Sequence, residues 1–113
     1  MTDLEKFNRL NVGAVIHALR INDLNIKQEK LSIDLRISQG SISKIENGVL
    51  EIGVSLYHRL LKYFDISPDE FSELLDIYIK ESLDAQRAEV SQQSHYEIDT
   101  KVANHAVGLR SIR

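Results

Sequence analysis

Residues that form tight turns are scarce in this sequence, which contains one Pro and five Gly among 113 residues. An all-β fold needs clusters of Gly or Pro between its short strands, and the sequence lacks them. The apolar residues instead recur at the three- and four-residue spacing of one helix face. No segment repeats at a fixed period, which argues against a solenoid. We therefore expect an all-α protein, with room for one ordinary domain and a short appendage.

The N-terminal third of the chain is predicted to form two helices. Apolar spacing places the first at about residues 11–22, and Leu4 and Phe7 either extend it backward or pack beneath it. After a polar break, a short second helix is expected at about residues 27–35. Asn25, with a Gln three residues later, has the form of a capping box at the start of this helix.

Two more helices are expected in the middle of the chain. Ser38 is predicted to cap a third helix that runs from Gln39 to about Asn47, and Gly48 is predicted to stop it in the left-handed conformation. A fourth helix is expected at about residues 53–64. The turn before the third helix is therefore only three or four residues long.

The stretch Ser67-Pro68-Asp69-Glu70 is the clearest helix start in the sequence. It combines a Ser cap, a Pro at the first helical position and an acidic residue at the third. We expect a fifth helix at about residues 68–90, followed by a linker-like stretch at residues 91–95. A last short helix is predicted at residues 100–107, closed by Gly108.

Residues 28–48 have the pattern of a helix-turn-helix motif, because two short helices flank a tight turn. Ile42 and Ile45 would hold the second helix to the core, leaving a polar outer face that can enter the major groove of DNA. Gln can pair with adenine, Lys can reach guanine or phosphate, and Ser suits either. The apolar spacing alone would also allow an ordinary helical hairpin. The base-facing positions on this outer face are Gln39, Gly40, Ser43 and Lys44.

Over about residues 12–71 the sequence resembles the lambda-repressor-like Cro/CI-type helix-turn-helix regulators, the XRE family. The resemblance implies a five-helix DNA-binding domain that binds operator DNA as a dimer. We expect this domain at residues 8–71 and a C-terminal helical extension at residues 72–113. The residues that carry the resemblance are Gln28, Leu31, Ile37-Ser38-Gln39, Ser41 to Gly48, Leu60, and Phe64 to Phe71.

The resemblance also supports the assignment of DNA contacts. It places Gln39, Gly40, Ser43 and Lys44 at the base-facing positions, and it places Gln28 and Asn47 at phosphate-facing ones. Arg36 departs from the family pattern, since a Gly commonly occupies this turn position. The expected phosphate contacts are Gln28, Lys27, Ser38 and Asn47.

The fifth helix is longer than a five-helix domain needs, so its distal apolar residues must be covered by something. We expect a homodimer interface there, which would set two recognition helices about 34 Å apart on DNA. An alternative is an antitoxin or other interaction module that binds a protein partner through the extension. The expected dimerisation residues are Leu74, Leu75, Tyr78, Ile79 and Leu83.

Several other classes of function are not expected. The chain has no Cys, and its four His are too scattered to indicate a metal site. No catalytic motif or cofactor-binding motif is found, so we expect neither an enzyme nor a cofactor. The sequence shows neither a secretory signal nor an apolar run long enough for a membrane span, and we expect a cytoplasmic protein. Although the net charge is −3, residues 8–71 carry eight basic and eight acidic side chains, so the predicted DNA-binding part is neutral.

Overall fold

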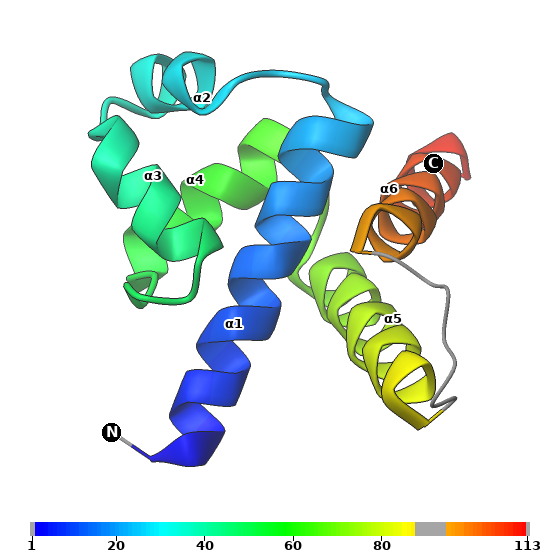
Figure 1. Ribbon diagram of the computed structural model, residues 1–113. Coiled ribbons are helices and arrows are strands. Elements are labelled where there is room, and N and C mark those ends of the chain that lie inside the picture. Colours follow the sequence, from blue (N-terminus) through cyan, green and yellow to red (C-terminus); the bar gives the residue numbers. More distant parts are fainter. Residues whose placement is uncertain (1, 88–94, 113) are drawn as a thin grey trace.

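The structure, a computed structural model, describes residues 2–87 and 95–112. In these residues every regular element is helical, which confirms the all-α prediction. Figure 1 shows α2, α3 and α4 on one side of α1, and α5 and α6 on the other. The elements are α1 (Asp3–Ala18), the π-helical turn η1 (Leu19–Asp23), α2 (Gln28–Leu35), α3 (Gln39–Glu46), α4 (Val54–Phe64), α5 (Pro68–Arg87) and α6 (His95–Ser111).

Helix α1 begins eight residues earlier than the predicted start at residue 11. The hydroxyl of Thr2 caps it by accepting a hydrogen bond from the Glu5 N–H at 3.1 Å. Leu4 and Phe7 therefore extend the helix backward, and their side chains stay 68% and 42% exposed rather than packing beneath it. The predicted end at residue 22 is replaced by the π-helical turn η1, which continues α1 directly.

The capping box predicted at Asn25 is wrong. Asn25 adopts a left-handed conformation with φ of 53°, and Lys27 is the N-cap of α2 without a side-chain hydrogen bond. The Gln28 side chain instead reaches Glu46 in α3. The cap predicted at Ser67 is confirmed, since Ser67 and Glu70 exchange reciprocal hydrogen bonds of 2.8 and 3.1 Å at the start of α5.

Helices α1 and α3 cross in backbone contact at Gly13. A Cβ atom at this position would lie 2.2 Å from the Ile45 carbonyl oxygen and 2.8 Å from the Glu46 carbonyl oxygen. Only glycine fits such an approach. At the end of α3, Gly48 has φ of 73°, which confirms the predicted left-handed stop. Gly13 thus fixes how closely α3 packs against α1.

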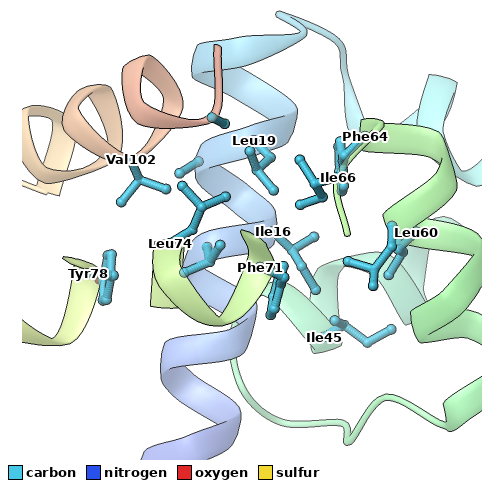
Figure 2. Close-up of a cluster of buried hydrophobic side chains, with 14 of the residues drawn as sticks. Ile16, Leu19, Ile45, Leu60, Phe64, Ile66, Phe71, Leu74, Tyr78 and Val102 are labelled. Atoms are coloured by element: carbon cyan, nitrogen blue, oxygen red, sulfur yellow. The ribbon is translucent and has the colours of Figure 1, made fainter. Parts of the chain in front are cut away.

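One continuous apolar core connects helices α1 to α5 with α6 (Figure 2). The boundary expected between residues 71 and 72 falls inside this core, because side chains of α5 and α6 pack with those of α1 and α4. The buried side chains that join the layers include Ile16, Leu19, Ile45, Leu60, Phe64, Ile66, Phe71, Leu74 and Val102.

Helix α6 is longer than the short helix predicted at residues 100–107. It starts at His95 and continues through Gly108, so the predicted stop at this glycine is wrong. Its buried face packs against α1, η1 and α5, and this packing outweighs the weak helix propensity of Gly108. The Arg110 guanidinium also binds both carboxylate oxygens of Asp23, at 3.0 and 2.5 Å. The predicted linker lies mostly outside the described residues.

The α5 stripe that we expected to form a dimer interface is only partly available on the surface. Leu74 is fully buried and Tyr78 is 6% exposed, because α1 and α6 cover them within the same chain. For these two residues, the expectation of a surface contact is wrong. Leu75 and Ile79 are partly buried, and Leu83 is 38% exposed.

Candidate nucleic-acid interface

Helices α2 and α3 form a helix-turn-helix with a three-residue turn, residues 36–38. Arg36 ends α2 in the left-handed conformation, with φ of 57° and ψ of 45°. This conformation explains why a glycine is favoured at the position. Ser38 then caps α3, accepting a hydrogen bond from the Ser41 N–H at 3.1 Å. The three-residue turn therefore fixes the orientation of α3 relative to α2.

The four predicted base-facing residues lie together on the outer face of α3. Gln39, Gly40 and Lys44 are exposed and Ser43 is partly exposed, while Ile42 and Ile45 are buried on the opposite face. Positions 39 and 43, like positions 40 and 44, are one helical turn apart. A Cβ atom at Gly40 would have only the Ser38 hydroxyl nearby, at 4.0 Å. The outer face is thus polar, and at Gly40 it has no side chain.

The predicted phosphate-facing residues flank this face. Lys27 is exposed at the start of α2, and Asn47 is exposed just after α3, where its amide donates to the Ser43 carbonyl at 2.9 Å. The Ser38 hydroxyl is engaged in capping α3 and donates to the Ser41 hydroxyl at 2.8 Å. The side-chain amide of Gln28 donates to Glu46 at 3.1 Å. One of its two N–H groups remains for a phosphate.

Behind the interface, the Glu46 carboxylate joins α1, η1, α2 and α3. Its side chain is 3% exposed, and Arg20 binds both of its oxygens, at 2.6 and 2.9 Å. His17 contacts the same carboxylate at 3.0 Å and Gln28 at 3.1 Å. Arg20 also donates to the Ile26 carbonyl at 2.8 Å, which ties down the loop before α2. The four groups together hold the C-terminal end of the recognition helix against the scaffold.

The electrostatics of this cluster keep Glu46 ionised. Burial alone would raise the pKa of Glu46, but the hydrogen bonds from His17, Arg20 and Gln28 and the charge of Arg20 lower it to about 2. The hydrogen bond to Glu46 raises the pKa of His17, partly against its own burial. Glu46 therefore has a structural role, because three side chains inside the domain pair with it. His17 and its partner Glu46 lie 29 positions apart in sequence.

Two side chains of helix α4 brace α2. The Arg59 guanidinium donates to the Leu35 carbonyl at the end of α2, and the Tyr63 hydroxyl donates to Asp34 at 2.5 Å. Asp34 also pairs with Lys30 at 2.9 Å. Lys27, Arg36 and Lys44 are exposed cations around α3. The contacts of Arg59 and Tyr63 join two helices, so no local sequence pattern predicts them.

Comparison with known families identifies the motif. Residues 16–71 match the model of a family described as helix-turn-helix, and the match spans the end of α1 to the first turn of α5. Residues 16–71 are a helix-turn-helix domain of the lambda-repressor-like XRE family. Members of this helix-turn-helix family are DNA-binding transcription regulators and are generally not enzymes. No curated protein and no solved structure matches the chain.

The described residues were also compared with the requirements of a membrane span and of a metal site. No helix within residues 2–87 and 95–112 is both long and apolar enough to cross a membrane. Over the same residues, no group of three His, Asp or Glu side chains is placed to hold a metal ion.

Proposed function

We propose that this protein is a dimeric, sequence-specific transcription regulator, most simply a repressor that occupies an inverted-repeat operator. The observation that carries the proposal is the outer face of α3. It presents three polar side chains and one glycine to solvent, and buried contacts hold the opposite face of the helix in place. These buried contacts come from Ile42, Ile45 and the ion cluster around Glu46. Membership of the XRE family supports DNA binding and transcriptional regulation.

Base recognition would come from the exposed groups of α3. The Gln39 amide suits the paired donor and acceptor of adenine, and the Lys44 ammonium suits guanine. Ser43 can donate or accept between them. The open surface at Gly40 allows the helix backbone to approach base edges closely. The proposed base-contacting residues are Gln39, Gly40, Ser43 and Lys44.

Phosphate contacts would fix the register of the helix on DNA without reading sequence. The free N–H of Gln28, the Lys27 ammonium, the Asn47 amide and groups near Ser38 surround α3 at its two ends. Residues 8–71 carry equal numbers of acidic and basic side chains, eight of each. Affinity for random DNA should therefore be modest, and useful binding should depend on base contacts and on two half-sites.

A mobility-shift experiment tests the assignment of α3. The probe is a DNA fragment enriched from a random pool by binding to the parent protein. Gln39→Ala and Lys44→Ala should each lose about 1 to 3 kcal/mol of binding free energy, roughly 5- to 150-fold. Lys80→Ala is the matched control, since it removes the same charge from an exposed position of α5. If the α3 variants bind as tightly as the control, α3 is not the reading helix.

The alternative role, an antitoxin or other protein-interaction module, receives less support from the extension. The apolar face of α6, formed by Ile98, Val102 and Ala106, is buried inside the chain and not offered to a partner. A toxin gene beside this one, with a gene product that binds the purified protein, would favour the alternative. A reporter assay with the enriched DNA upstream distinguishes repression from activation.

A further inference from the structure

One oxygen of the Glu46 carboxylate is shared by three donors from three elements. Its Oε1 atom lies 3.0 Å from Nδ1 of His17 in α1, 2.9 Å from Nη2 of Arg20 in η1 and 3.1 Å from Nε2 of Gln28 in α2. Because an ionised carboxylate only accepts hydrogen bonds, Nδ1 of His17 carries a proton whether the ring is neutral or charged. His17 is therefore bound to the same atom as Gln28, whose side-chain amide is a proposed phosphate contact.

His17 is the member of this cluster whose charge can change near neutral pH. Its side chain is 40% exposed, whereas those of Arg20 and Glu46 are 7% and 3% exposed. Water can therefore deliver a proton to the His17 ring while the cluster stays closed. With a neutral imidazole, the charges of Arg20 and Glu46 cancel. Protonation of His17 gives the cluster a net positive charge beside Gln28.

The groups that face His17 from the neighbouring helices favour this protonation. The hydrogen bond to Glu46 raises the pKa of His17, partly against burial of the ring. The charges of Glu46 in α3 and Asp99 in α6 raise this pKa further, and the charge of Arg20 in η1 lowers it. From α5, Tyr78 lines the same cavity as His17. Burial raises the pKa of the Tyr78 hydroxyl, so this group stays uncharged near neutral pH.

We infer that His17 is a positioning residue for DNA binding, which acts on the phosphate contact of Gln28 through the shared oxygen of Glu46. The inference rests on the proposed function and adds a proton to it. One N–H of the Gln28 amide is held by Glu46, and the other is directed to a phosphate. An imidazolium at His17 attracts that phosphate and strengthens its own hold on Glu46, whereas a neutral ring adds no charge.

The size of the effect follows from the distances. The Nδ1 atom of His17 and the Nε2 atom of Gln28 are at most about 6 Å apart, since each lies about 3 Å from the same oxygen. A phosphate oxygen that accepts from Gln28 lies about 3 Å further. Opposite unit charges about 9 Å apart tighten binding about 2-fold in the limit of bulk water and about 20-fold in the limit of a protein surface. By linkage, DNA should raise the affinity of His17 for its proton by the same factor.

The dissociation constant for DNA, measured by fluorescence anisotropy between about pH 5.5 and about pH 8.5 at constant low ionic strength, tests the inference. Both the enriched fragment and a duplex of unrelated sequence serve as probes. The parent should bind about 2- to 20-fold more tightly at the acidic end. His17→Gln keeps a side-chain donor for Glu46 but cannot be protonated, so its affinity should not follow pH. His58→Gln, which removes an exposed imidazole from α4, is the matched control and should behave as the parent does.

Two more measurements separate positioning from a purely structural role. Gln28→Ala should bind more weakly and lose most of the pH dependence, so its effect and that of His17→Gln should not add. In an NMR titration of the native protein, the protonation midpoint of the His17 ring should rise when DNA is bound.

The same pH dependence in the parent and in His17→Gln would overturn the inference, and so would the parent's full pH dependence in Gln28→Ala or an unmoved His17 midpoint. If the parent prefers one sequence but binds it equally across the pH range, only the role of His17 is refuted. If acid tightens binding through His17 while no sequence is preferred, only the proposed sequence-specific function is refuted.

Discussion

Gly13 carries the largest effect that we expect from adding a single methyl group. In Gly13→Ala the new Cβ would lie 2.2 Å from the Ile45 carbonyl oxygen, more than 1 Å closer than ordinary contact. The nearby atoms belong to the backbone of α3, so they cannot turn aside as a flexible side chain does. Helices α1 and α3 must separate instead. Overpacking of this kind costs about 1 to 3 kcal/mol, and alanine returns at most about 1 kcal/mol of helix propensity.

We therefore expect Gly13→Ala to lower the free energy of unfolding by about 2 kcal/mol, measured by urea denaturation followed by circular dichroism. Gly108→Ala makes the same chemical change in α6, where nothing lies within 4 Å of the new Cβ. This control should gain stability, by up to about 1 kcal/mol. Binding of the enriched DNA should weaken in Gly13→Ala, because α3 is displaced from α1. It should stay unchanged in Gly108→Ala. A Gly13→Ala protein as stable as the parent would refute the close crossing of α1 and α3.

Two further predictions concern charge and backbone strain. The Glu46 pKa of about 2, against 4.5 for a free Glu, makes the ion cluster stabilising above pH 4.5, and about 3 kcal/mol of this should be lost as the pH falls through the folded pKa. The raised His17 pKa acts in the opposite sense, adding stability below pH 6.5 that is lost as pH rises through its folded pKa. Denaturation midpoints measured from pH 3 to 9 should therefore be highest between pH 4.5 and pH 6.5. In Glu46→Gln the fall of the midpoint below pH 4.5 should become smaller. If this fall is the same in Glu46→Gln and in the parent, Glu46 does not make the stabilising ion pairs. Separately, Arg36→Gly should stabilise the fold by up to about 1 kcal/mol, because Arg36 occupies the left-handed region, with φ of 57°. A loss of thermal stability in Arg36→Gly would mean that the Arg36 side chain makes a contact that offsets this strain.

Features with a local sequence signal were predictable. The capped starts of α3 and α5 and the stop at Gly48 follow from residues within one turn of each boundary, and the structure has them where expected. The exposed face of α3 was also predictable, since burial of Ile42 and Ile45 fixes which side faces outward. These elements are the ones that the XRE-family match covers.

Contacts between distant segments had no such signal. The partners of Glu46 lie 18 to 29 positions away, and no spacing rule connects them. Gly13 looks like an ordinary helix-weakening residue until α3 is placed against it. Gly108 has the sequence form of a helix stop, yet packing of α6 on η1 and α5 carries the helix through it. Leu74 and Tyr78 were misassigned for the same reason, because the position of α6 could not be read from α5.

Selection of bound DNA from a random pool, followed by sequencing, tests directly whether α3 reads a DNA sequence. We predict one enriched motif with two inverted half-sites whose centres lie about 10 base pairs apart, matching two recognition helices on one face of the duplex. Gln39→Ala and Lys44→Ala should change the preferred bases inside each half-site and leave the half-site spacing unchanged. A pool with no enriched sequence, or the same motif selected by the parent and by both variants, would contradict sequence reading by α3.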